Sequence, residues 1–124
     1  DVFNIALYTS TSTNDSTTTA YTTTNEITNT AGTAYVAGGQ ALVGAVTANT
    51  TSTSWVDFTT DPQWTTATFT ANSALIYNAT QLVSGNGRSV CVLSFGGDKT
   101  ITAGTFTVQF PTADATSALI RISA

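Results

Sequence analysis

The chain has 124 residues, and its seven acidic and three basic side chains give a formal charge of −4 at pH 7. This length corresponds to a single domain over residues 1–124, and the negative balance disfavours binding to the phosphates of nucleic acid. Histidine is absent and there is one cysteine, which excludes His-based metal centres, Ser-His-Asp triads, Cys-His pairs and an intrachain disulfide.

Charged residues make up only 8% of the chain and hydrophobic residues 41%, while threonine and serine fill much of the remainder. A disordered chain would carry more charge and fewer apolar residues, and the β-branch of threonine favours extended backbone. No apolar run approaches the roughly 20 residues that span a membrane, so we expect no membrane partner. The composition therefore predicts a rigid β-protein that is extracellular or carried on a particle.

The first segment, residues 2–8, places Phe3, Ile5 and Leu7 on one side of an extended chain, which is the period of a strand. A tract rich in Thr, Ser and Asn follows at about 9–33. Because this tract lacks proline and runs of charge, it predicts a long loop or arm, or a pair of weak edge strands.

The middle of the chain contains several short candidate strands separated by glycine, proline and polar turn signals. These candidates lie at residues 34–37, 40–47, 54–58, 65–71 and 74–78. The pattern at 65–71 is the clearest for a half-buried strand, and a two-residue break separates it from the next candidate.

Two further turns are predicted in the last third of the chain. Ser84-Gly85-Asn86-Gly87 is a strong tight-turn signal, and Gly96–Lys99 turns the chain into a strand at 100–110. Residues 89–95 between these turns are apolar on both faces, which predicts a central strand covered by a second sheet. A closing strand is expected at 118–122.

About eight strands and no amphipathic helix predict an antiparallel β-sandwich of the jelly-roll type. Aromatic side chains on or beside these strands are expected to form most of the core between the two sheets. They are Phe3, Trp55, Phe58, Phe69, Phe95, Phe106 and Phe110.

Few residues have the types and spacing that catalysis or ligand binding requires. Asp57 and Asp61 are the acids closest to a glycosidase pair, but Asp61-Pro62 also begins a turn, and Asp57 fits the solvent side of its strand. Cys91 lies in an apolar segment and is expected to be a core residue. No loop has the alternating Asp/Asn pattern of a calcium site. We therefore predict no catalytic residue, no metal ligand and no cofactor, although a structural cation stays open.

Some aromatic and basic residues are not assigned to the predicted core. Tyr21, Tyr35, Tyr77 and Trp64 are the least clearly buried aromatics, and such residues in loops can bind sugars or a partner protein. Lys99 and Arg121 are two of only three basic residues; either can bind a carboxylate across an interface or serve as an ordinary surface charge.

Segments along nearly the whole chain resemble a recurrent type of small virion structural protein from tailed bacteriophages. The resemblance is carried by residues 5–10, 19–26, 35–42, 55–58, 74–78, 92–99 and 106–111. This type has no catalytic motif. By analogy with phage proteins that stabilise capsids, it implies a cement or decoration protein that is not an enzyme. Such a protein lies on the outer capsid surface, binds the major capsid protein between capsomers and clusters at three-fold positions, which favours a homotrimer.

A capsid role predicts that uncharged polar side chains of the 9–33 tract contact neighbouring subunits, because they form hydrogen bonds without the cost of burying a charge. The alternative is a tail or fibre component that adsorbs to a host-surface glycan through loop aromatics such as Trp64. The candidate interface residues are Thr11, Thr13, Asn14, Thr18, Tyr21, Asn25, Trp64 and Arg121.

Overall fold

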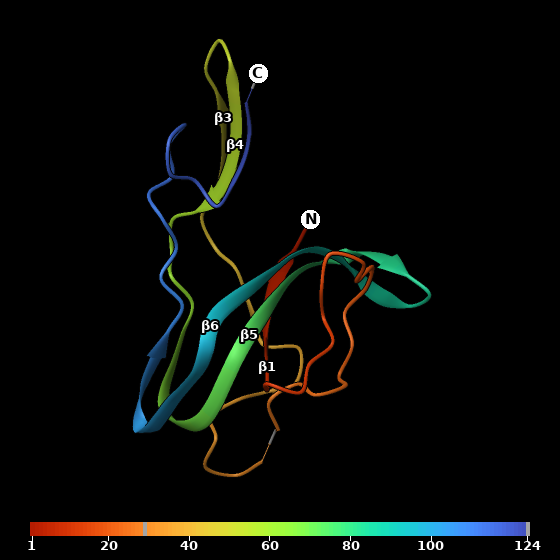
Figure 1. The fold of residues 1–124 in the computed structure, drawn as a ribbon, viewed down its shortest axis with the longest axis vertical. Coiled ribbons are helices and arrows are strands. Elements are labelled where there is room, and N and C mark those ends of the chain that lie inside the picture. The colour runs from red at the N-terminus through yellow and green to blue at the C-terminus, as the bar shows by residue number, and fades with distance from the viewer. Residues whose placement is uncertain (29, 124) are drawn as a thin grey trace. The chain divides into compact units, whose positions relative to one another are not determined.

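The computed structural model describes residues 1–28 and 30–123, and within these ranges every helical or extended element is a strand (Figure 1). The described strands are β1 (Phe3–Tyr8), β2 (Gln40–Ala41), β3 (Ala45–Asn49), β4 (Thr53–Phe58), β5 (Gln63–Val83), β6 (Asn86–Thr107) and β7 (Ile120–Ser123). They form two antiparallel sheets. The predicted all-β class is confirmed, with seven strands in the described ranges where about eight are predicted.

The first sheet has the strand order β2-β1-β5-β6, with β1 and β5 at its centre. β1 pairs with β5 over its whole length, so that Ile5 lies opposite Ile76 and Leu7 lies opposite Ala74. The last four residues of β1 are completely buried. The alternating pattern of residues 2–8 therefore predicts this strand correctly.

Strands β5 and β6 are much longer than the sequence pattern predicts, with 21 and 22 residues. The predicted break at Asn72–Ser73 is wrong, and so is the predicted turn at Gly96–Lys99, because the two strands run through them. Asn72 in the predicted break donates a hydrogen bond from Nδ2 to Oδ1 of Asp98 in the predicted turn, at 2.9 Å. The two glycines of the predicted turn have φ values of 74° and 149°, so their conformational freedom produces a local irregularity in β6 and not a reversal.

The tight turn between β5 and β6 is confirmed at Ser84-Gly85. Both residues have positive φ, 51° and 83°, which is the backbone of a type I′ hairpin turn. At Gly87, just after the turn, an added Cβ would collide with the ring of Tyr77. This second glycine is needed because β6 lies directly against that aromatic ring.

The segment predicted as a central strand, residues 89–95, lies instead in β6 at the edge of the first sheet. The prediction of a central strand covered by a second sheet is wrong: the segment lies in an edge strand, Val90 is 43% exposed, and Cys91 to Leu93 are half-buried. An uncharged, apolar stretch of chain therefore lies along a sheet edge.

Residues 9–33 form a long loop over their described part, as predicted, with two isolated bridges to the rest of the sheet. The short strand predicted at 34–37 is not formed. Ala34 instead has a φ of 59°, and the next residue, Tyr35, is buried.

The second sheet has the strand order β3-β4-β7, with β4 at its centre. The strand predicted at 54–58 is confirmed as β4, and the closing strand predicted at 118–122 is confirmed as β7. Val46 of β3 lies opposite Asp57, and Arg121 of β7 lies opposite Trp55.

The chain separates into two compact units. Unit 1 contains Asp1–Ala41 and Trp64–Phe106, and unit 2 contains Leu42–Gln63 and the chain from Thr107 onward. The first sheet lies almost entirely in unit 1, and β3, β4 and β7 lie in unit 2. The single domain over residues 1–124 stays a prediction.

Each unit has its own aromatic cluster. In unit 1 the Trp64 ring lies 6.0 Å from Tyr35 and 6.4 Å from Phe69, measured between centroids. In unit 2 the rings of Phe58 and Phe110 are 5.9 Å apart. Of the predicted core aromatics, three are buried and four are half-buried, the latter being Phe3, Trp55, Phe95 and Phe106. Trp64 and three of the four tyrosines are buried in place of those four.

Candidate functional site

The carboxylate of Glu26 joins the long loop of unit 1 to the segment that follows it. Oε1 of Glu26 accepts hydrogen bonds from the Tyr35 hydroxyl at 2.6 Å and from the Gly38 N–H at 2.7 Å, and Oε2 accepts one from the Tyr21 hydroxyl at 2.7 Å. Hydrogen bonds to an ionised acceptor are stronger than those between neutral groups. We call these four residues the Glu26 clasp, because they join the loop to the segment that follows it.

All four tyrosines of the chain belong to the surroundings of this clasp. Tyr21 stacks on Tyr77 with ring centroids 4.6 Å apart, and the Tyr8 hydroxyl donates to the carbonyl of Thr22 at 2.6 Å. Burial, with the negative charge of Glu26 adding to it, raises the pKa of Tyr8 to about 12. The pKa values of the other three tyrosines are also raised, chiefly by burial and further by Glu26. The phenols therefore stay neutral and can act as hydrogen-bond donors.

The loop is fixed to the sheet at its base. The N–H of Thr9 donates to the carbonyl of Asn25 at 2.9 Å, and Nδ2 of Asn25 donates to the carbonyl of Thr11 at 2.9 Å. Tyr8 and Glu26 form an isolated antiparallel bridge directly beside these bonds. The base of the loop is thus closed by backbone and side-chain bonds.

The loop is fixed a second time where it meets the beginning of β6. The Tyr21 N–H donates to the carbonyl of Gly87 at 2.8 Å, and the Ser89 N–H donates to the carbonyl of Thr19 at 3.0 Å. The Ser89 hydroxyl also donates to the carbonyl of Thr18. These bonds give the hydroxyl-rich loop a defined position on unit 1, and the loop is not a free arm.

The predicted interface residues of this loop differ in their exposure. Thr11 and Thr13 are exposed, whereas Asn14, Thr18 and Asn25 are half-buried. Thr18 accepts a hydrogen bond at its Oγ1 from the N–H of Asp15 at 2.9 Å. Of these predicted residues, the two exposed threonines are available to contact another molecule, and the half-buried ones shape the loop.

Three predicted interface residues have other surroundings. Tyr21 is half-buried in the Glu26 clasp, and Arg121 is exposed in β7 of unit 2. The expectation that Trp64 is a loop aromatic is wrong: it lies in β5 and is only 5% exposed. Its indole packs against core aromatics and is not presented on the surface.

The two acids considered as a glycosidase pair both bind backbone N–H groups within unit 2. Asp57 is completely buried; its Oδ1 accepts from the Phe58 N–H at 2.7 Å and its Oδ2 from the Leu119 N–H at 2.9 Å. The expectation that Asp57 lies on the solvent side of its strand is wrong. Oδ1 of Asp61 accepts from the Phe110 N–H at 2.8 Å. Both carboxylates join separate segments of unit 2, which is a structural role.

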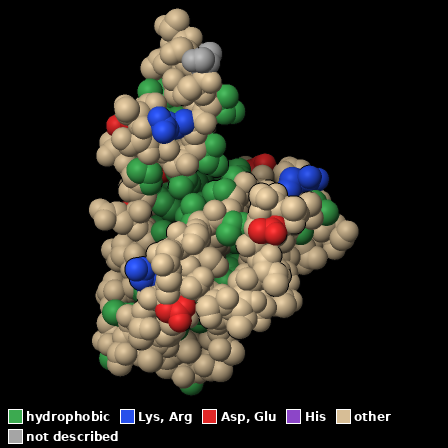
Figure 2. All heavy atoms as spheres, in the orientation of Figure 1, with side chains coloured by type: hydrophobic (Ala, Val, Ile, Leu, Met, Phe, Trp, Pro, Cys, Tyr) green, Lys and Arg blue, Asp and Glu red, His purple; other side chains and the backbone are tan. Residues whose placement is uncertain are grey.

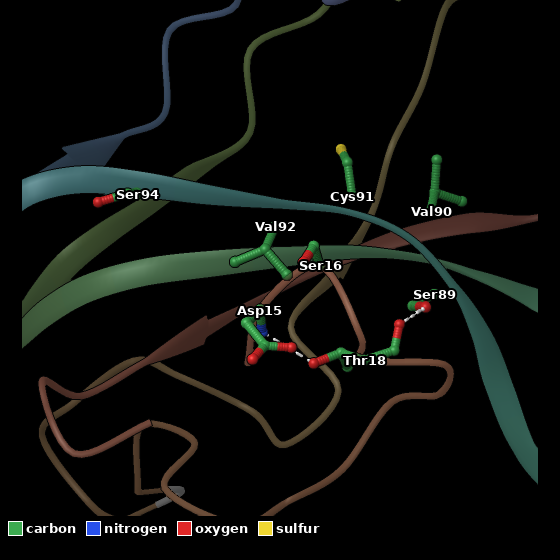
Figure 3. A pocket seen from close by; sticks show the side chains of 8 residues that line it. All are labelled: Asp15, Ser16, Thr18, Ser89, Val90, Cys91, Val92 and Ser94. Atoms are coloured by element: carbon green, nitrogen blue, oxygen red, sulfur yellow. Dashed lines mark hydrogen bonds between the residues drawn. The ribbon is translucent and has the colours of Figure 1, made fainter. Parts of the chain in front are cut away.

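A groove with a volume of about 440 Å³ lies between the loop residues Asp15–Thr18 and the β6 residues Ser89–Ser94 (Figure 3). Its lining is mainly hydroxyl groups and small apolar side chains. Cys91 is half-buried there as a free thiol, and burial raises its pKa. The side chain of Cys91 points to the side of β6 opposite to that of Val92, which points toward Ser16 (Figure 3).

Neither a metal centre nor a membrane-spanning helix is found in the part of the chain that the structure describes. Residues 1–28 and 30–123 contain no group of three or more His, Cys, Asp or Glu side chains close enough to hold a metal ion. The same ranges contain no helix long and apolar enough to cross a membrane. No protein-family model, curated protein or solved structure matches the chain.

Sequence reasoning missed the central residue of the clasp. Glu26 is the one glutamate of the chain and lies within an otherwise nearly uncharged tract. A lone carboxylate among threonines, with tyrosines on either side at positions 21 and 35, is a signal that could have identified it. The sequence pattern predicts its partners Tyr35 and Gly38 in a separate short strand and a turn.

Proposed function

We propose that this chain is a structural protein of a bacteriophage virion. In this proposal it is a capsid cement or decoration protein on the outer capsid surface, where it binds the major capsid protein and stabilises contacts between capsomers. The sequence resemblance over nearly the whole chain supports the proposal. The jelly-roll-like β-sandwich of about eight strands, with both sheets in one domain, and the homotrimer are parts of the same proposal.

The observation that carries this proposal is the fixed, hydroxyl-rich loop of unit 1, in which Asp15 and Glu26 are the charged residues. Its exposed threonines, Thr11 and Thr13, lie on a segment held at its base by Asn25 and at β6 by the Thr19–Tyr21 pairing. A rigid surface loses little conformational entropy when it binds, and hydroxyl groups bind a neighbour without desolvating a charge. Charged side chains are few on the face shown in Figure 2. Many weak contacts of this kind add up on a symmetric shell.

The first test is the number of copies of this chain per purified particle, measured by quantitative mass spectrometry against the major capsid protein. A ratio near one supports a shell component. A number closer to that of a tail or vertex structure would contradict the cement assignment and favour the tail component. With Trp64 buried, that alternative lacks the exposed loop aromatic that its glycan contact requires.

The second test changes the loop surface and leaves the Glu26 clasp and the pairing with β6 in place; the side-chain bond that it alters is that between the hydroxyls of Thr9 and Thr11, at 2.9 Å. The variant Thr11→Asp, Thr13→Asp places two charges on the exposed face of the loop, and we expect it to lose particle binding while it stays folded. The matched control is Thr51→Asp, Thr60→Asp, which adds the same charge at two exposed threonines of unit 2. Equal binding of both variants would show that the loop is not the capsid contact.

A further inference from the structure

The outer edge of β6 has no strand partner beyond Ser89 among the described residues. β6 is the last strand of its sheet, and the loop pairs only with its first residues, through Gly87 and Ser89. Backbone groups of alternate residues in a strand point to the same side. The backbone N–H and C=O groups of Gly87 and Ser89 point toward the loop. Those of Cys91 and Leu93 therefore point to the same side of β6, where the edge is open.

This open edge lacks the features that usually protect a sheet edge from other strands. Residues 89–97 contain no charged side chain and no proline, and Val90 is 43% exposed. Natural proteins protect such edges with charges, proline or a covering segment, and an unprotected edge tends to pair with another chain. The groove of about 440 Å³ begins where the loop leaves the edge at Thr18, so the space beside the edge is open.

The β7 strand of unit 2 has complementary properties. It is the outer strand of its sheet, and its residue Ile122 is 75% exposed. Ile120 and Ile122 share one face of the strand, and Arg121 points to the other. Arg121 is exposed, and its guanidinium reaches the carbonyl of Ala115 only at 3.5 Å. Among the described strands, β7 therefore presents an apolar face and a positive charge at the outer edge of its sheet.

We propose that β7 of a second copy pairs with the open edge of β6, with its Ile120 and Ile122 against Cys91 and Leu93 and its Arg121 toward Asp15. The two faces of β7 match those of β6. Cys91 lies on one side of β6, where the isoleucines would pack, and Val92, Ser16 and Asp15 lie on the other, where Arg121 would lie (Figure 3). The Asp15 carboxylate is exposed, and hydrogen bonds from Thr17 hold its pKa below the usual value, so it carries a negative charge at neutral pH.

The contact joins two different surfaces of the chain, and contacts of this heterologous kind form a ring when the rotation between successive copies closes and an open filament when it does not. It deepens the proposed function, on which its biological meaning rests, because a ring of copies is the arrangement expected of a homotrimeric decoration protein. A four-residue strand buries little area, so each contact is weak and gains strength from ring closure and repetition. The test must therefore detect a weak association.

Disulfide trapping in the purified chain meets that need. Cys91 is the only cysteine, so Ile122→Cys supplies a second thiol at the position proposed to lie beside Cys91 of a neighbouring copy. Mild oxidation is expected to give covalent oligomers on a non-reducing gel. Thr51→Cys, an exposed position in the β3–β4 turn of unit 2, is the matched control for random collisions. The double variant Ile122→Cys, Cys91→Ser has its one thiol at position 122, so any disulfide it forms joins position 122 of two copies.

A charge exchange tests the geometry of the contact. Arg121→Asp in the trapping variant replaces an attraction by a repulsion, and we expect cross-linking to fall by about fivefold, the scale of exposed ion pairs. Adding Asp15→Arg should restore it, because the two charges are then exchanged. Rescue by a second substitution distinguishes this contact from a general loss of folding.

Cross-linking no greater than in the Thr51→Cys control, a disulfide within one chain, or no rescue by the charge exchange would overturn the proposal. These results come from the purified chain without particles. A failure here leaves the loop-surface test of particle binding unaffected, and failed particle binding leaves the cross-linking result unaffected.

Discussion

At the scale of single residues, Glu26 is the group on which the position of the long loop depends most. It accepts three hydrogen bonds of 2.6–2.7 Å from residues that are 5, 9 and 12 positions away in the chain. Two of the donors are tyrosine hydroxyls in buried or half-buried surroundings, where a lost partner leaves a polar group unsatisfied. The charge on one side chain therefore organises three separate segments.

We expect Glu26→Gln to lower the free energy of unfolding by about 2 kcal/mol, because it replaces charge-assisted hydrogen bonds by weaker neutral ones and mismatches one donor. Urea unfolding measures the loss. Hydrogen exchange should show that the substitution increases the exchange rates of residues 9–25 more than those of β1. Tyr21→Phe, which removes one of the three bonds, is the control and should have a smaller effect. An unchanged unfolding midpoint in Glu26→Gln would contradict the role of the clasp.

The tyrosines predict how stability depends on alkaline pH. Their pKa values are raised in the folded chain, to about 12 for Tyr8, while an unfolded tyrosine has a pKa of about 10. Above about pH 10 the unfolded chain therefore loses protons that the folded chain retains. This stability is fully present below about pH 10 and is lost as pH rises toward the folded pKa values.

In urea midpoints measured from about pH 9 to about pH 11, the contribution of the tyrosines should stay constant up to about pH 10 and fall as the pH rises above it. Tyr21→Phe should make the fall shallower, because one of the titrating phenols is gone. Burial also raises the pKa of Cys91, which acts in the same direction, and Cys91→Ser separates its share. Midpoints that stay constant across the window would show that the tyrosines titrate alike in both states.

At the scale of elements, local pattern predicts a strand well where the pattern is strong, as in β1 with its alternation of Phe3, Ile5 and Leu7. It fails at Asn72 and at Gly96-Gly97, since residues that favour turns also fit inside a long strand when a cross-strand partner such as Asp98 is present. Local pattern cannot predict the Glu26 clasp either, because it too depends on partners elsewhere in the chain. Its bonds join segments through tertiary contacts, which no periodicity records.

The β5–β6 turn gives a prediction about a single element. Ser84 has a φ of 51°, a left-handed conformation that asparagine adopts more readily than serine, and Asn-Gly is the favoured pair in type I′ turns. Ser84→Asn should therefore raise the free energy of unfolding by about 0.5 kcal/mol, in line with substitutions that suit the native backbone. Ser84→Val, whose β-branched side chain opposes positive φ, should lower it. Thermal unfolding of both variants gives the comparison, and a Val variant as stable as the Asn variant would contradict the turn assignment.

At the scale of the whole molecule, the two compact units raise the question of whether they fold together. Unit 2 has 22 residues in Leu42–Gln63 and 18 from Thr107 to the end, 40 in all. The single cysteine of the chain gives it no intrachain disulfide, and chains of about 40 residues without disulfides or metals are rarely stable alone. Its folding is therefore expected to be coupled to that of unit 1, as a single domain requires.

The two tryptophans allow a direct test, since Trp64 lies in unit 1 and Trp55 in unit 2. In a Trp55→Phe background the fluorescence of Trp64 reports on unit 1, and in a Trp64→Phe background that of Trp55 reports on unit 2. Glu26→Gln changes a group that lies only in unit 1. If the units unfold together, this substitution should shift the urea midpoint equally in both backgrounds, because a two-state transition has one free energy. A shift seen by Trp64 and not by Trp55 would mean that unit 2 is stable by itself, and the chain would then contain two domains rather than the one that its length predicts.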